Sequence, residues 1–198
     1  MKKTIYILLF VFSTVITNAQ ITNTQHPETI ISNHDGITQK EAPSNSYIKD
    51  IFQDFDKYIG TWAWTNGSDI VKYKITKITK YYYSEYDVYK DILVCDYSYT
   101  TNNNSITVVN TITNPTTNLW LGHPMYSSGE FGNKVNFTFY DVLLQKGWAS
   151  AIFEISPNNI NEMNVKLLNP NGTFGRLDSD PEYNFNFTLP TELTLIKE

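Results

Sequence analysis

The strongest pattern in the chain is an alternation of apolar and polar residues that recurs from about residue 60 to the C-terminus. Val71, Tyr73 and Ile75 alternate with polar residues, and similar sets follow at 93–99, 135–139, 149–155, 163–167 and 185–189. Successive side chains of a β-strand point to opposite faces, so the alternation predicts half-buried strands. With no helix pattern between them, we expect an all-β protein, an antiparallel barrel or sandwich of about eight to ten strands.

A different pattern precedes these strands. Residues 46–59 place apolar side chains at three-and-four spacing, and Ser46 is a residue type that favours the N-terminal cap of a helix. The spacing predicts one short N-terminal amphipathic helix that covers an end of the barrel. Gly60 then permits a sharp bend into the first strand, where Trp62 is well placed to fill the barrel end.

The step Gly60-Thr61-Trp62 after a helix resembles the start of the calycin group, which comprises lipocalins and fatty-acid-binding proteins. The whole chain also resembles uncharacterised secreted lipocalin-like bacterial proteins. This second likeness rests on the same step and on Phe139-Tyr140-Asp141, Thr188-Leu189-Pro190 and Leu193-Thr194-Leu195. The resemblance implies a lipocalin-like barrel and carries no established activity. It fails at one place: fatty-acid binders hold the ligand carboxylate with late-strand arginines, whereas the only arginine here, Arg176, lies in a predicted loop.

The N-terminal region divides into two predicted segments. Basic Lys2-Lys3, an apolar run and small residues ending at Ala19 predict a signal peptide over residues 1–19. The apolar run is too short to span a membrane, so we expect a secreted or periplasmic protein without stable membrane insertion. Residues 20–45 are polar and lack an apolar period, which predicts a disordered leader. Residues 46–198 then make up one barrel domain.

Charge and cysteine usage narrow the possible partners. The formal net charge is -5 and no basic run lies outside the predicted signal, which argues against nucleic-acid binding. Cys95 is the single cysteine, so no disulfide forms within the chain. It shares strand parity with Leu93 and Tyr97, which predicts a buried core position rather than a reactive thiol. No pattern indicates an oligomeric state.

Candidate catalytic chemistry is sparse. His123, Ser127 and Ser128 share an irregular stretch, residues 114–133, but no Gly-x-Ser-x-Gly elbow is present, so a hydrolase ranks below binding functions. Residues 178–182 carry oxygen donors at alternate positions, as calcium requires, yet lack the glycine and distal glutamate of a twelve-residue calcium loop. The favoured interpretation there is a solvated acidic loop. We therefore predict no catalytic residue, no metal site and no cofactor.

Two binding functions remain. The first is a carrier that encloses a small, uncharged, apolar ligand beside large and small residues of one inward face: Phe137, Phe139, Ala149, Ala151 and Phe153. The alternative is a surface module for glycan or protein, which suits the many tyrosines and asparagines and places Trp120 in a binding loop. An internal cavity of a few hundred cubic ångströms would favour the carrier. A filled barrel with an exposed aromatic strip would favour the surface module.

Overall fold

The computed structural model describes residues 29–170 and 184–198. Its strands are β1 (Thr29–Ser32), β2 (Ser46–Lys49), β3 (Gly60–Asn66), β4 (Asp69–Tyr83), β5 (Val88–Thr101), β6 (Ile106–Asn110), β7 (Met125–Phe131), β8 (Lys134–Asp141), β9 (Lys146–Ser156), β10 (Asn159–Leu168) and β11 (Glu192–Lys197). Two short 3-10 helices are η1 (Asn33–Asp35) and η2 (Trp120–Gly122). Neither helix of the described residues has the length and apolar character that a membrane-spanning helix requires.

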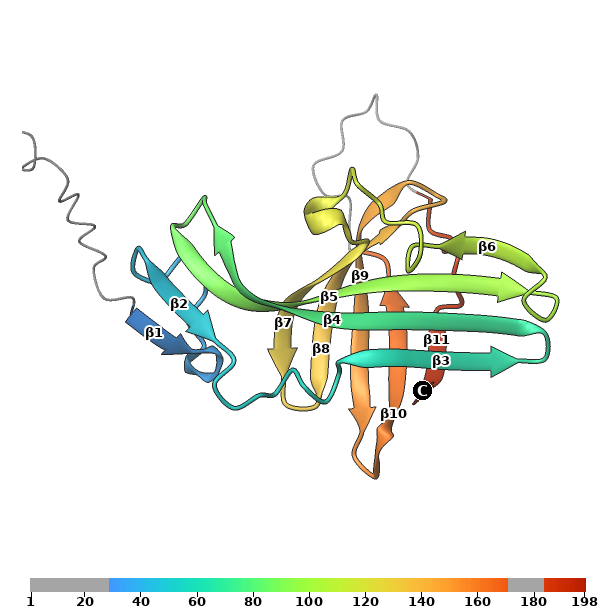
Figure 1. Ribbon diagram of the computed structural model, residues 1–198, viewed down its shortest axis with the longest axis horizontal. Coiled ribbons are helices and arrows are strands. Elements are labelled where there is room, and N and C mark those ends of the chain that lie inside the picture. Colours follow the sequence, from blue (N-terminus) through green and yellow to red (C-terminus); the bar gives the residue numbers. More distant parts are fainter. Residues whose placement is uncertain (1–28, 171–183) are drawn as a thin grey trace, which may run out of the picture.

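Eight of the strands close into an antiparallel barrel. From β3 to β11, leaving out β6, each strand pairs with the next along the chain, and β11 returns to β3 through Ile196 opposite Ala63. In Figure 1 the long strands β3, β4 and β5 run across the layer formed by β8, β9 and β10. The prediction of an all-β, antiparallel barrel of about eight strands is therefore confirmed.

The hairpin of β4 and β5 is longer than the barrel wall and carries an extension. Residues 88–90 of β5 pair with β2 in parallel, and β2 pairs in parallel with β1. The opposite end of β5 pairs with β6, while Val94 and Cys95 in its middle pair with β7. Figure 1 shows β1, β2 and the hairpin tip lying together on the left, away from β10 and β11.

The alternating apolar residues point into the barrel. Val71, Tyr73 and Ile75 are each no more than 1% exposed, and Cys95 is fully buried, as its parity predicted. Trp62 is fully buried, and its indole Nε1 donates a hydrogen bond of 2.7 Å to the Tyr58 carbonyl. Gly60 has a φ of +130°, and a Cβ there would lie 3.1 Å from Cε of Lys197. The positive φ would thus strain any side chain at position 60, and the end of the Lys197 side chain would have to shift to make room for it.

The predicted helix over residues 46–59 is wrong. Ser46–Lys49 forms β2, because Tyr47 and its neighbours pair with β5, and turns follow as far as Tyr58. The carboxylate of Asp50 accepts hydrogen bonds from the backbone N–H groups of Asp54 and Phe55. Such local side-chain bonds compete with helical ones, and Gln53 adopts a left-handed φ of 60°. The apolar spacing was real, but a capped turn buries Phe55 and Tyr58 instead.

Two other boundaries also differ from expectation. Residues 29–45, placed in a disordered leader, contain β1 and η1, and Ile31 is buried against Ile48 and Val88. The irregular stretch 114–133 contains β7, which closes the barrel by pairing with both β5 and β8. Serines and a glycine weaken the strand signal of β7, so pairing rather than local preference forms it. Residues 1–19, 20–28, Arg176 and 178–182 lie outside the described residues.

Candidate functional site

The five residues predicted to contact an internal ligand lie together inside the barrel. Phe137 pairs with Ala151 and Phe139 pairs with Ala149 across β8 and β9, and each of the five is at most 1% exposed. The Phe137 and Phe153 ring centroids are 4.9 Å apart. Each alanine therefore lies opposite a phenylalanine, the large-to-small matching that fills a packed core. Their role in ligand binding stays a prediction.

One polar group in this interior is unsatisfied. The Tyr73 hydroxyl is buried and has no hydrogen-bond partner among the described residues, while its ring packs edge-on against Phe153 at 5.1 Å. Burial raises the pKa of this hydroxyl well above its ordinary value, and the charges of Cys95, Tyr97 and Asp141 act in the same direction. Tyr73 is therefore a neutral donor in a mostly aromatic environment.

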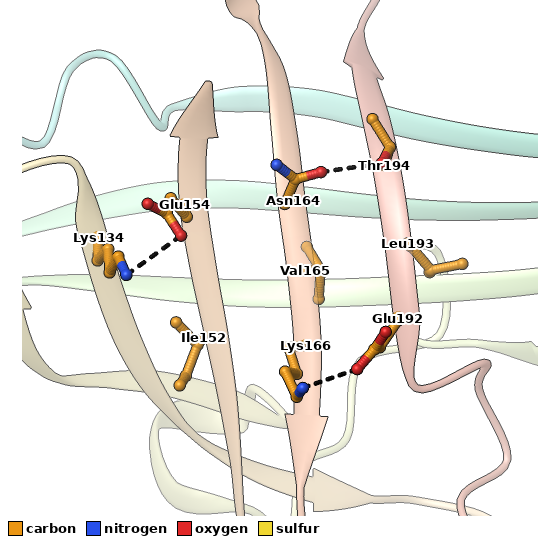
Figure 2. Close-up of a pocket in the computed structure, with 9 residues that line it drawn as sticks. All are labelled: Lys134, Ile152, Glu154, Asn164, Val165, Lys166, Glu192, Leu193 and Thr194. Carbon is orange, nitrogen blue, oxygen red and sulfur yellow. Dashed lines mark hydrogen bonds and ion pairs between the residues drawn. The ribbon is translucent and has the colours of Figure 1, made fainter. Parts of the chain in front are cut away.

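A depression of about 430 Å³ lies on the outside of the barrel wall over β8 to β11. Figure 2 shows its polar side chains already paired across neighbouring strands. Lys134 contacts Glu154 at 3.3 Å, Lys166 contacts Glu192 at 2.7 Å, and Thr194 donates to Asn164 at 2.8 Å. These are ordinary cross-strand surface pairs, and they leave few polar groups directed at a ligand.

After the barrel interior and the outer depression, the third candidate site is an aromatic cluster on the outer face of β4, β5 and β7. We define the Trp120 cluster as the four rings of Tyr81, Tyr83, Trp120 and Tyr126. The Trp120 ring centroid is 4.3 Å from that of Tyr126, 5.2 Å from that of Tyr81 and 5.8 Å from that of Tyr83. Trp120 is 37% exposed, whereas the tyrosines are only half-buried supports. An indole thus lies on a platform of tyrosines with part of its surface open to solvent.

Tyr83 of the cluster is held in its neutral form. Burial raises the pKa of the Tyr83 hydroxyl to about 12, although a hydrogen bond with Gln39 works against this rise. Tyr81 and Tyr83 come from β4 beyond the irregularity between Ile78 and Tyr81, where the hairpin leaves the barrel. The hairpin extension therefore supplies two of the three tyrosines of the platform.

A tight loop holds Trp120 in place. The Leu119 N–H donates to the Thr116 carbonyl, and the Thr116 hydroxyl donates to the Gly122 carbonyl at 3.1 Å, so the loop is closed on itself. Leu121 has a left-handed φ of 56°, which costs a residue with a side chain of its own about 1–2 kcal/mol. Strain of this kind persists only where surrounding contacts fix the backbone, and it is concentrated at functional sites.

His123 follows directly on this loop and pairs with β5. Its Nδ1 lies 2.8 Å from Oδ2 of Asp96, and the backbone N–H of His123 donates to the Trp120 carbonyl. The side chains of His123 and Asp96 are 28% and 15% exposed. The other carboxylate oxygen of Asp96, Oδ1, is buried without a hydrogen-bond partner among the described residues. The loop and the residue that follows it therefore carry an aromatic group and an oriented imidazole three positions apart in the sequence.

The structure does not join His123 to the serines considered with it. Ser127 Oγ accepts a hydrogen bond from the Leu93 N–H, and Ser128 Oγ donates to the Asn136 carbonyl. Over residues 29–170 and 184–198, no group of three or more metal-ligating side chains comes together. His34, from the predicted leader, pairs with Asp54 at 2.6 Å and stacks on Phe52.

A family model decides what the chain is related to. It matches residues 1–198, the whole length. The chain belongs to a family of unknown function, DUF6705. No curated protein and no solved structure gives a match.

The sequence names Trp120 as a candidate but does not predict the tyrosines that contact it. Tyr81, Tyr83 and Tyr126 were visible as part of a tyrosine-rich composition, with no local signal that they meet one ring in the loop. Asp96 is 27 positions from His123 and could be linked to it only through the pairing of β5 with β7. The residue types Trp120 and Leu121 did not predict the left-handed conformation of Leu121.

Proposed function

We propose that this protein is an exported, non-catalytic recognition module that binds a neutral glycan on the Trp120 cluster. The observation that carries the proposal is the partly exposed Trp120 ring, supported by three tyrosines and presented by a strained loop. The packed phenylalanines inside the barrel also favour a surface module over a carrier, because they occupy the space that a carrier would leave open.

The chemistry of an aromatic platform suits a sugar ring. The face of an aromatic ring is electron-rich and the edge electron-poor. A pyranose presents a flat array of C–H groups with weak positive character on one face and hydroxyl groups around its rim. Stacking joins the C–H face to the indole, while the hydroxyls need polar partners beside it. The tyrosine hydroxyls, of which that of Tyr83 is held neutral, and the His123–Asp96 pair provide such partners.

The size and charge of the site favour a glycan over a protein. A stable protein interface buries about 800 Å² on each partner. In the Trp120 cluster only Trp120 is exposed by more than a third, which matches one or two sugar units better than an interface of that size. The chain carries a formal net charge of -5, so acidic polysaccharides would be repelled and neutral ones would not.

Two finer proposals accompany this function. The signal-like residues 1–19 support export to the periplasm or the cell exterior, where polysaccharides are found. The closed meander of eight strands, with a buried tryptophan on its first strand, supports assignment to a lipocalin-like type of barrel. A ligand that binds to the outer surface of a lipocalin-like barrel would contact its hairpins and loops.

Affinity electrophoresis tests the proposed function. The folded protein, net negative, is run in native gels that contain a soluble β-glucan, xylan or mannan, and retardation measures binding. We expect one of these polysaccharides to retard the wild type and Trp120→Ala to weaken binding at least about thirtyfold, the loss of about 2 kcal/mol or more typical of a central aromatic contact. Phe52→Ala is the matched control, because Phe52 is 64% exposed and lies outside the cluster. Equal retardation of the two variants, or none of the wild type, would refute the proposal.

A second candidate function is a carrier for a small, uncharged, largely apolar ligand inside the barrel. The specific observation in its favour is the buried Tyr73 hydroxyl, which could donate to a single polar atom of such a ligand. Native mass spectrometry of protein purified from its own host tests it, together with a thermal-shift screen of neutral lipids. A bound mass that Tyr73→Phe removes would support the carrier, and an unliganded mass with no shift would count against it.

A further inference from the structure

The His123–Asp96 pair leaves one imidazole nitrogen available beside the Trp120 cluster. Nδ1 is engaged with Asp96 at 2.8 Å, whereas Nε2 has no hydrogen-bond partner among the described residues. When the neutral ring donates its Nδ1–H to a carboxylate, Nε2 keeps a lone pair and acts as an acceptor. The side chain is 28% exposed, so this lone pair is within reach of a ligand on the surface.

The strand register places this imidazole near the aromatic rings. Asp96 is two residues from Val94 on β5, and the two share one face of the sheet. Val94 lies opposite Tyr126 on β7, and the Tyr126 ring centroid is 4.3 Å from that of Trp120. The His123 N–H also donates to the Trp120 carbonyl. One loop therefore holds the indole and the imidazole over the same outer face.

We propose that Nε2 of His123 accepts a hydrogen bond from an equatorial hydroxyl of a neutral sugar ring stacked on Trp120. The proposal rests on the proposed glycan-binding function and names its ligand class: a β-linked polymer of sugars whose hydroxyls are all equatorial. Such hydroxyls lie close to the plane of the stacked ring and point sideways, away from the indole. A ring with an axial hydroxyl interrupts the flat C–H face and stacks less well.

Asp96 has a positioning role in this scheme. Its carboxylate fixes the orientation of the imidazole and, in the neutral ring, selects the tautomer with its lone pair on Nε2. An anchor needed only to hold the loop would not require a carboxylate whose second oxygen, Oδ1, is buried without a partner among the described residues. Burial of an unpaired acceptor is destabilising. A cost of this kind is typical of functional sites, where local rules are broken.

The variant His123→Asn separates a contact with the ligand from a structural anchor. The side-chain amide of asparagine reaches the position of Nδ1, so the hydrogen bond to Asp96 is retained while the group at Nε2 is removed. We expect His123→Asn to bind a soluble β-glucan about five- to tenfold more weakly than the wild type in affinity electrophoresis, the loss of one hydrogen bond. Its melting temperature should stay within about 2 °C of the wild-type value, as for a surface change.

The same gels distinguish failure of this inference from failure of the proposed function. Binding by the wild type that Trp120→Ala abolishes and His123→Asn leaves unchanged would overturn the role of His123 and retain the aromatic site. No binding of any neutral glycan by the wild type would overturn both. A second readout uses mannan, whose sugar carries an axial hydroxyl: equal or tighter binding of mannan than of β-glucan would contradict the proposed ligand class.

Discussion

Trp62→Ala is the substitution that most directly tests how the barrel is packed. Trp62 is fully buried next to the chain closure, where Lys197 of β11 pairs with it and the Lys197 ammonium lies 5.0 Å from its ring centroid. Truncation to alanine leaves a cavity that the closed sheet cannot collapse to fill. It also removes the indole N–H, so the buried Tyr58 carbonyl loses its 2.7 Å hydrogen bond.

These two losses define the expected magnitude. Removal of a large aromatic from a core costs about 3–5 kcal/mol, and full burial with a lost hydrogen bond places Trp62 in the upper part of that range. Because a domain of this kind has a total stability of about 5–15 kcal/mol, the variant should unfold at much lower denaturant concentration. Urea melts followed by far-UV circular dichroism measure this loss. Trp64→Ala is the control, since Trp64 lies on the same strand but is only half-buried. A loss below about 1 kcal/mol for Trp62→Ala, or a larger one for Trp64→Ala, would refute the packing role.

Three further predictions concern ionisable groups. Asp50, whose side chain is fully buried, pairs with Lys77 at 2.7 Å and accepts two backbone N–H groups, so Asp50→Ala should cost about 3–5 kcal/mol in the same urea melts. Burial lowers the pKa of Lys77. The hydrogen bond and charge of Asp50, together with the charges of Asp56 and Asp91, raise this pKa by more than burial lowers it, so it lies above its ordinary value. The pair's contribution to stability is therefore complete below about pH 10.4 and is lost as pH rises through the higher folded-state pKa. The stability difference between wild type and Lys77→Met should shrink over that window, and a difference that is constant up to pH 12 would exclude the linkage. Burial raises the pKa of the Cys95 thiol well above its ordinary value, with Asp96 acting in the same direction, so a thiol reagent should label Cys95 only after unfolding. Rapid labelling of the native protein would contradict its core position.

The parts of the fold that the sequence predicted correctly are those with a local cause. Val71, Tyr73 and Ile75 alternate because one face of β4 is buried, and that period is visible in the sequence. The helix prediction for residues 46–59 was wrong because amphipathic spacing also arises in a turn that buries Phe55 and Tyr58. By spacing alone, the carboxylate of Asp50 that caps this turn cannot be distinguished from a polar residue on a helix surface.

The candidate site was only partly predictable because its members come from separate strands. Trp120 stood out as a large aromatic in an irregular stretch, but Tyr81 and Tyr126 reach it only through the pairing of β4 with β5 and of β5 with β7. Likewise Asp96 gives no sequence signal of its own, since any outward strand position can hold a carboxylate. Pairings over such separations depend on closure of the whole barrel, which single-sequence patterns do not specify.

Indole NMR distinguishes a ligand bound outside the barrel, on Trp120, from one bound inside it. In a ¹⁵N-labelled sample each tryptophan gives a separate Nε1–H resonance, and the variants Trp120→Phe and Trp62→Phe assign the two that matter. Titration with a soluble β-glucan should shift the Trp120 resonance, while that of Trp62, buried and bonded to the Tyr58 carbonyl, stays in place. A shift of Trp62 with no change at Trp120, on addition of either glucan or a neutral lipid, would contradict the surface site and place the ligand inside the barrel.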